Sequence, residues 1–335
     1  MQFEYAIINP RKHGLGKARF LTMSRMQWLA TLGMVAICQA CGLSSHPLAP
    51  SNLGKSSSLA EMEKLVDAPG PIEVETVNSA DWAVPLEGLL NLQSAAAQEA
   101  HLSNHVEPIH VFAHVLRHPN FGNYLVDTGV AQSLIDDPGA HGVSWPIRVF
   151  MPLDKMQVRN STAQILAHTP GGIQGVFFTH LHIDHISGMP DIPGSVPLYV
   201  GRSETTRASF QNLFVRGTTT SLLEGKAELR EWPFRLDEGH NTLVIGDVLD
   251  IFGDGSAFAI SVPGHTPGST AYVLRTPKGP VLLTGDTSHT RWGWEHGVEP
   301  GSYTADQPTN RKSLLLLKDL AGRHPAMDVR LGHQY

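Results

Sequence analysis

The most informative stretch of the chain is FFTHLHIDHISGMP, residues 177–190. It places three histidines and one aspartate within six residues, directly after an apolar run: His180, His182, Asp184 and His185. Buried polar groups are costly unless they are paired, so a packed core gains nothing from such a cluster. The pattern therefore indicates a bound cation with imidazole and carboxylate ligands.

Further residues of ligand type recur where strands are expected to end. His265 lies in VPGHTPGST, Asp286 follows the apolar run of LLTGDTSH, and His333 follows the last expected strand in RLGHQY. In an extended loop, residues two apart, such as His180 and His182, point the same way. Three imidazoles and an open position make a catalytic zinc site, and a carboxylate can be shared with a second metal. Seven residues supply this inventory: His180, His182, Asp184, His185, His265, Asp286 and His333.

A single histidine at a strand end is usually an ordinary solvated or hydrogen-bonded residue, and this alternative applies to His265 or His333 taken alone. It does not account for the cluster at 180–185. His289, three residues after Asp286, is an intermediate case. The remaining histidines without such context are expected to be solvated or hydrogen-bonded: His101, His105, His110, His114, His118, His141, His168 and His240.

The composition is that of a globular protein. The chain has 335 residues, of which 41% are hydrophobic and 17% charged, enough for a sizeable core. A net charge of −6 offers no basic footprint for nucleic acid, so a small-molecule substrate is expected. The two cysteines, Cys38 and Cys41, both lie near the N-terminus, which leaves the body of the chain without a thiolate ligand. The oligomeric state stays open.

Residues 23–45 resemble a secretory signal. A basic start precedes an apolar stretch of about a dozen residues and then small residues. The apolar stretch is short for a membrane span. We expect translation to begin at Met23 and the protein to be exported to the periplasm. In CQAC, followed by Gly42, the residue Cys41 fits the lipidated position of a lipoprotein signal, which would anchor the protein to the membrane; cleavage after Ala40 is the alternative.

The chain is expected to divide into three parts. Residues 1–40 form the N-terminal extension and signal, residues 41–70 a flexible tether, and residues 71–335 one catalytic domain. The tether is inferred from the Pro-, Ser- and Gly-rich composition of residues 46–58. Helices are predicted at 161–170, 203–214 and 311–322. Strands are predicted at 107–119, 122–129, 173–178, 196–201, 242–246, 247–252, 257–262, 270–276, 279–286 and 328–333. Strands interleaved with helices favour an α/β arrangement with the helices outside the sheets.

The motifs together resemble the metallo-β-lactamase superfamily. THLHIDH matches its H-x-H-x-D-H signature, and PGHTPGS, LLTGD and LGH match its later ligand motifs in order. The resemblance, from about Ile109 onward, implies an α/β fold, the four-layer αβ/βα sandwich, with two metals at one edge of the facing sheets. It assigns His180, His182 and His265 to the first metal, Asp184, His185 and His333 to the second, and Asp286 to both. It also assigns Asp127, in LVDTG, a supporting role behind the ligand loop.

The resemblance narrows the substrate. The true β-lactamases of the superfamily place cysteine or a small polar residue where this chain has Asp286, so that activity is not expected. Among the other branches of the superfamily, the chain is most similar to the N-acyl-homoserine lactonases and their neighbours among ester and organophosphate hydrolases. Those lactonases often carry a tyrosine three residues after the bridging aspartate, where this chain has His289. The next tyrosine downstream is Tyr303.

The expected chemistry is hydrolysis of a carboxylic ester or lactone by a metal-bridged hydroxide. Asp184 would carry the proton to the leaving alkoxide, and His289 or Tyr303 would donate to the oxyanion. Zinc is the default for two divalent ions in such a site, and iron, manganese or cobalt suit the same ligands. Alternatives are an organophosphate or other ester hydrolase, and a metal-binding protein without catalysis. Four aromatic residues are candidates for an acyl pocket or for ordinary core: Phe210, Phe214, Trp292 and Trp294.

Overall fold

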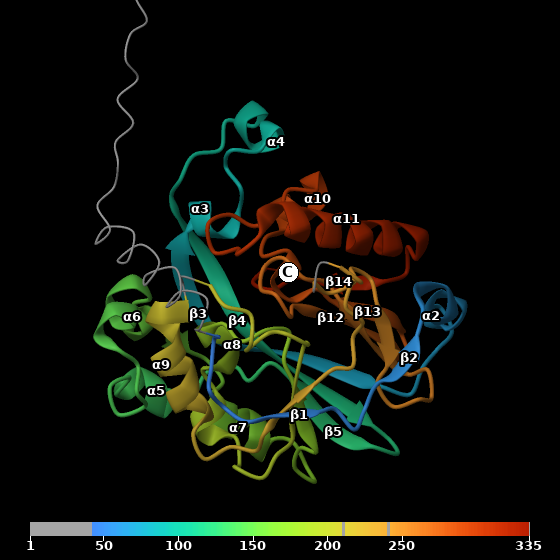
Figure 1. Cartoon of the computed structure of the whole chain (residues 1–335), viewed down its shortest axis with the longest axis horizontal. Coiled ribbons are helices and arrows are strands. Elements are labelled where there is room, and N and C mark those ends of the chain that lie inside the picture. Colours follow the sequence, from blue (N-terminus) through green and yellow to red (C-terminus); the bar gives the residue numbers. More distant parts are fainter. Residues whose placement is uncertain (1–41, 210–211, 240–241, 335) are drawn as a thin grey trace, which may run out of the picture.

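The computed structural model describes residues 42–209, 212–239 and 242–334. Two β-sheets face each other within this part of the chain, and helices cover their outer sides (Figure 1). Figure 1 shows α5, α6, α7 and α9 beside the larger sheet and α11 beside the smaller one. The predicted αβ/βα sandwich is confirmed.

The larger sheet has eight strands. In spatial order they are β1 (Leu48–Pro50), β9 (Leu229–Glu231), β8 (Leu198–Val200), β7 (Gly175–Phe177), β5 (Gly122–Val126), β4 (Val106–His118), β3 (Glu73–Pro85) and β6 (Gln157–Val158). The run from β1 to β5 is parallel, and β3 and β4 form a long antiparallel pair. Strands β7 and β8 are buried throughout, as expected for parallel strands covered on both faces.

The smaller sheet has six strands. They are β14 (Asp328–Arg330), β13 (Gly279–Leu283), β12 (Thr270–Thr276), β11 (Ala257–Ser261), β10 (Val248–Asp250) and β2 (Lys55–Ser57). All pairings are antiparallel except that of β13 with β14. The carboxyl ends of β13 and β14 therefore lie at the same edge.

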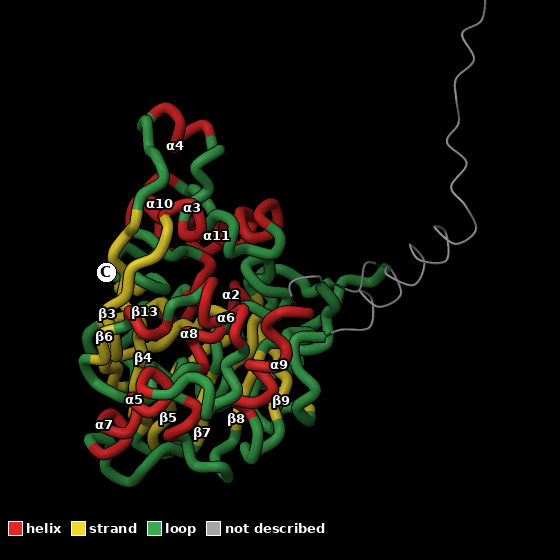
Figure 2. Tube along the Cα trace, turned by 90° about the vertical axis from the view of Figure 1, so that its left-hand side faces the viewer, coloured by secondary structure: helices red, strands yellow, loops and turns green. Residues whose placement is uncertain are grey.

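The helices are mostly short and connect the strands (Figure 2). They are α2 (Leu59–Val66), α3 (Leu86–Leu89), α4 (Ala95–Glu99), α5 (Gln132–Asp136), α6 (Trp145–Phe150), α7 (Thr162–Ala167), α8 (Ile183–Ile186), α9 (Asn212–Leu223), α10 (Arg291–His296) and α11 (Gln307–Arg323), with 3-10 turns at Leu153–Lys155, Met189–Asp191 and Gly285–Thr287. The predicted helix at 311–322 is confirmed as α11, which begins earlier because Asp306 caps it by accepting from the Thr309 N–H. None of the helices in the described ranges combines the length and apolar character that a membrane crossing requires.

An aromatic core joins the two sheets beneath the histidine loop. The ring of Phe177, at the end of β7, stacks on Tyr124 of β5 with centroids 4.7 Å apart and on Tyr272 of β12 at 5.9 Å. The Tyr272 hydroxyl donates to the Phe178 carbonyl at 2.7 Å. Because these rings are buried, they hold the chain that leads to the histidine loop against the second sheet.

The prediction of a flexible tether at 41–70 is wrong for the part that the structure describes. Strand β1 pairs with β9 at the edge of the larger sheet, strand β2 pairs with β10 at the edge of the smaller sheet, and α2 buries Met62 and Val66. The Pro-, Ser- and Gly-rich composition did not reveal these strands, because backbone hydrogen bonds hold an edge strand and polar residues supply them as well as apolar residues do. The predicted signal at 1–40 lies outside the described residues.

Two element predictions are also wrong. Ser203 adopts a left-handed conformation with φ of 68°, so turns replace the first part of the helix predicted at 203–214, and α9 covers Asn212–Leu223. The predicted strand at 242–246 contributes only one isolated bridge, Leu243 to Leu236. The sequence analysis also missed β3, a strand of mixed polarity whose first half is partly exposed.

Candidate active site

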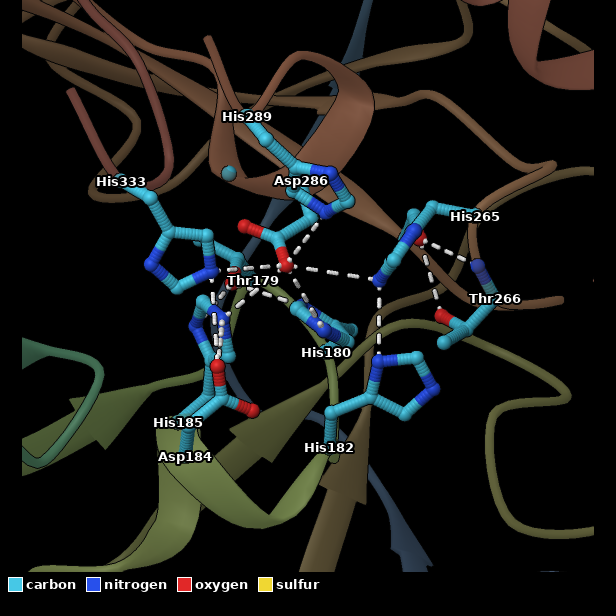
Figure 3. Close-up of polar contacts among 12 residues, drawn as sticks. Thr179, His180, His182, Asp184, His185, His265, Thr266, Asp286, His289 and His333 are labelled. Atoms are coloured by element: carbon cyan, nitrogen blue, oxygen red, sulfur yellow. Dashed lines mark hydrogen bonds and ion pairs between the residues drawn. The ribbon is translucent and has the colours of Figure 1, made fainter. Parts of the chain in front are cut away.

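Loops at one edge of the facing sheets bring the predicted ligands together (Figure 3). The chain leaving β7 carries His180 and His182, and His182 is the N-cap of α8, whose first turn holds Asp184 and His185. The 3-10 turn after β13 carries Asp286. The turn between β11 and β12 and the loop after β14 complete the set, which comprises all seven predicted residues: His180, His182, Asp184, His185, His265, Asp286 and His333.

The first group contains three imidazoles and one carboxylate: His180, His182, His265 and Asp286. Their potential ligand atoms all lie within 4.8 Å of one another. His265 Nε2 lies 2.9 Å from His182 Nδ1 and 3.4 Å from Asp286 Oδ2. His180 Nε2 approaches the same carboxylate oxygen at 3.7 Å. This is the ligand type and number of a metal site.

The second group shares Asp286 and adds three residues from both sheets: Asp184, His185 and His333. His333 Nε2 lies 3.3 Å from Asp286 Oδ2 and 3.4 Å from Asp184 Oδ2. His185 Nε2 lies 3.3 Å from the same oxygen of Asp286. Asp286 therefore stands between the two groups, where a bridging ligand would be.

The donor atoms fit two divalent cations. Within the described part of the chain, three buried atoms of the site have no hydrogen-bond partner: His180 Nε2, His185 Nε2 and Asp286 Oδ1. Buried polar atoms are ordinarily paired, and these three belong to the two groups described above. A cation held between them would supply the missing interaction.

The electrostatics of the site also favour a positive ion. Burial holds the pKa of His182 down to about 4 and that of His180 well below its usual value, so both imidazoles are neutral, as metal ligands must be. Burial opposes a charge on His185, but Asp286, Asp127 and Asp184 outweigh it and raise the pKa of His185 well above its usual value. The carboxylates therefore attract positive charge to this point.

Asp127 supports the second group, as the sequence resemblance implied. Its Oδ1 accepts from the Thr179 N–H at 2.8 Å, and its Oδ2 accepts from His185 Nδ1 at 2.8 Å. The Thr179 hydroxyl also donates to Asp127 Oδ2 and lies 3.1 Å from His180 Nδ1. Partners of this kind fix the tautomer of an imidazole and leave Nε2 free toward the site.

Other supporting groups were not predicted. His333 Nδ1 donates to the His110 carbonyl at 2.8 Å, and His265 Nδ1 lies 3.1 Å from the Thr304 hydroxyl. Glu204 accepts from the backbone between two ligands, at Leu181. No sequence motif marks these partners, because they come from distant segments.

His289 contacts the carboxylate of Asp286, which both ligand groups share. Its Nε2 is 3.0 Å from Asp286 Oδ2, and its Nδ1 donates to the Leu89 carbonyl at 3.0 Å. The side chain is 1% exposed. Both ring nitrogens are thus engaged by protein groups, so His289 fixes Asp286 against α3.

Tyr303 lies beside the same short helix. Its ring covers Gly88, where an added side chain would overlap it, and the residue is 41% exposed. Burial raises the pKa of the Tyr303 hydroxyl, and the carboxylates of Asp184 and Glu87 raise it further. The phenol therefore keeps its proton at neutral pH within the field of Asp184.

The predicted aromatic residues have different surroundings. Trp292 stacks on His296 with ring centroids 4.1 Å apart, and the partly buried Trp294 packs against a core cluster that includes Leu317 of α11. Phe214 is 52% exposed on α9, and Phe210 lies outside the described residues. The two tryptophans thus serve the packing of α10.

Several histidines outside the site are hydrogen-bonded, as expected: His105, His110, His114, His118 and His168. His114, for example, lies 2.7 Å from the Thr76 hydroxyl. His240 lies outside the described residues.

Two buried ligand groups that share a carboxylate, at one edge of an αβ/βα sandwich, define a metal-dependent hydrolase. The chain belongs to the metallo-beta-lactamase superfamily, whose family model matches residues 106–333. N-acyl homoserine lactonase AttM of Agrobacterium fabrum is 31% identical over 225 residues, which cover 65% of this chain and 80% of that protein. Gamma-lactamase MBL2 of Gibberella moniliformis is 32% identical over 145 residues, 40% of this chain and 59% of that protein. The crystal structure of a quorum-quenching N-acyl homoserine lactone lactonase shares the fold, with a TM-score of 0.56 and 17% identity over 80% of this chain and 94% of that chain.

Proposed function

We propose that this protein opens the lactone ring of N-acyl homoserine lactones by hydrolysis, a quorum-quenching activity. The observation that carries the proposal is the complete set of seven ligand-type residues, with Asp286 common to both groups, in a chain 31% identical to an N-acyl homoserine lactonase. A protein that only bound such a compound would not need this arrangement.

Each ligand group would hold one divalent cation, and Asp286 would be shared by both. When bound, such ions polarise a carbonyl and lower the pKa of a water molecule. We propose zinc because imidazoles dominate the site, while cobalt, iron and manganese accept the same donors. Burial keeps the imidazoles of His180 and His182 neutral by lowering their pKa values. Hydrogen bonds at Nδ1 fix the ring orientations of His185 and His333.

Asp184 is the proposed proton carrier. Its Oδ2 faces the imidazoles of His185 and His333, at 3.7 and 3.4 Å, and the residue is 8% exposed. Figure 3 shows the other carboxylate oxygen pointing away from these contacts. That oxygen could accept a proton from the attacking water and return it to the alkoxide that leaves the ring.

Tyr303 is the proposed donor to the developing oxyanion. His289 is less suited to this task because both of its nitrogens contact protein groups. The Tyr303 hydroxyl stays protonated because its pKa is raised by burial and by Asp184, so it can donate a hydrogen bond.

The proposal is tested by comparing kcat/KM on a panel of compounds: an N-acyl homoserine lactone, an acyclic ester, a phosphotriester, a γ-lactam and a β-lactam. Proton release reports hydrolysis of the first three, and His182→Ala serves as the metal-site control. We expect the lactone to be hydrolysed fastest. A faster phosphotriester would assign the protein to organophosphate hydrolysis, and metal binding without turnover of any compound would indicate a non-catalytic role.

We also propose export, on the basis of the sequence of residues 23–41. Fractionation of the producing cells should place the protein outside the cytosol. Incorporation of a radioactive fatty acid that is lost in Cys41→Ser would identify a lipoprotein, whereas an intact N-terminus at Met1 in the cytosol would refute export.

A further inference from the structure

Glu204 is a buried carboxylate that neither the motifs nor the proposed chemistry uses. It follows β8 and is 1% exposed. Its Oε1 accepts from the Leu181 N–H at 2.8 Å. Its Oε2 accepts from the Gly268 N–H at 2.8 Å and from the Thr266 hydroxyl at 2.7 Å. Three donors therefore converge on one side chain with little access to water.

These three donors belong to the two loops that carry the first ligand group. Leu181 lies between His180 and His182, while Thr266 directly follows His265. Glu204 thus links the loop of two imidazoles to the loop of the third. The link spans two segments more than 80 residues apart, whose rings meet where His265 Nε2 lies 2.9 Å from His182 Nδ1.

The contact between Glu204 and the His265 loop is also tight. A Cβ added at Gly268 would lie 2.7 Å from the Glu204 Cβ and 2.8 Å from the Gly201 carbonyl oxygen. Because real side chains do not approach this closely, the position needs glycine. The backbone of the His265 loop therefore rests directly on Glu204.

Asp127 makes the corresponding contacts for the second group, through Thr179 and His185. Through the Thr179 hydroxyl Asp127 also reaches His180 of the first group, whereas the hydrogen bonds described for Glu204 all come from the loops that carry the first group. Removing a group that orients metal ligands typically costs 10- to 100-fold in metal affinity.

We infer that Glu204 is a positioning residue that sets the metal affinity of the first site, His180, His182 and His265, separately from that of the second. The inference rests on metal binding by the two groups and is independent of the substrate.

The experiment compares Glu204→Gln with Glu231→Gln in the full chain. Glutamine keeps the shape of Glu204 but replaces one accepting oxygen with an amide NH2, which cannot accept a hydrogen bond from the loop donors. Glu231 is the matched control because it accepts a backbone hydrogen bond at 3.0 Å from Ser203, which is not a residue of a ligand loop. Metal-stripped protein is titrated with Co²⁺ against a chelator, and absorbance reports the two dissociation constants. We expect Glu204→Gln to weaken one site by about 10- to 100-fold, with the other site and Glu231→Gln unchanged.

Two backgrounds assign the affected site. In the His333→Ala background, which keeps the first ligand group intact, Glu204→Gln should weaken Co²⁺ binding to its full extent. In the His182→Ala background, where the first group is already incomplete, Glu204→Gln should have no further effect on Co²⁺ binding. Equal weakening of both sites, or a lower melting temperature with unchanged Co²⁺ affinity, would overturn the inference. If Glu204→Gln does not fold, Thr266→Val removes one of the three hydrogen bonds and should weaken the same site to a smaller extent; unchanged Co²⁺ affinity in folded Thr266→Val would equally overturn it.

Discussion

Gly332→Ala tests the placement of the bridging carboxylate without changing a ligand. Gly332 precedes His333, and a Cβ added there would overlap Asp286 Oδ1 and lie 3.1 Å from the Gly285 carbonyl oxygen. Gly332 does not have a positive φ, so its backbone conformation itself accepts alanine. The effect of the substitution is therefore confined to Asp286 and its surroundings.

The displacement can be estimated from this overlap. Restoring ordinary contact requires the carboxylate to move by about 1 Å, and a misplacement of that size costs about 100-fold in rate. This corresponds to roughly 2.7 kcal/mol of transition-state stabilisation. Asp286 cannot adjust freely, because His289 and His333 contact its other oxygen at 3.0 and 3.3 Å. We expect kcat to fall accordingly and at least one metal to bind more weakly.

The assay measures kcat on the best substrate of the panel and the metal content per chain. Gly322→Ala is the matched control: it lies within α11 with nothing within 4 Å of an added Cβ, so it should retain full activity and gain up to about 1 kcal/mol of stability. Gly332→Ala with wild-type kcat and both metals bound would refute the assignment of Asp286 as a shared ligand.

Four further outcomes are expected. Asp184→Asn should keep most of its metal, since an amide oxygen can still ligate, but lose most of its kcat because an amide cannot carry the proton; parallel loss of metal and kcat would make Asp184 a ligand only. Tyr303→Phe should lower kcat by roughly 10- to 100-fold at unchanged metal content, and unchanged kcat would exclude the hydroxyl as a donor. Chelation should abolish turnover and lower the melting temperature, and added Zn²⁺ should restore both. Burial lowers the pKa of His114 to about 3 from 6.5, so between these pH values the unfolded state binds one more proton than the folded state. The free energy of unfolding therefore decreases as the pH falls from 6.5 toward 3. In urea titrations, His114→Gln should reduce this pH dependence of the free energy of unfolding by up to about 1.4 kcal/mol per pH unit.

The sequence by itself predicted the set of ligand-type residues that the structure brings together. Metal chemistry requires imidazole and carboxylate side chains, so their types and spacing are visible without coordinates, and the structure brings all seven together. The leucine spacing of α11 was equally local, because a helix packs one stripe of side chains against a sheet and buries Leu314, Leu317 and Leu320.

The tertiary structure alone decided which groups support those ligands. Glu204, Thr304 and the Leu89 carbonyl act through hydrogen bonds to segments far away in the chain, whereas the contact of His289 with Asp286 is local. For a related reason, the sequence analysis did not predict that β1 and β2 form edge strands of the two sheets. Every residue except proline carries the same backbone donor and acceptor, so the partner that satisfies them depends on where the fold places each segment rather than on residue type.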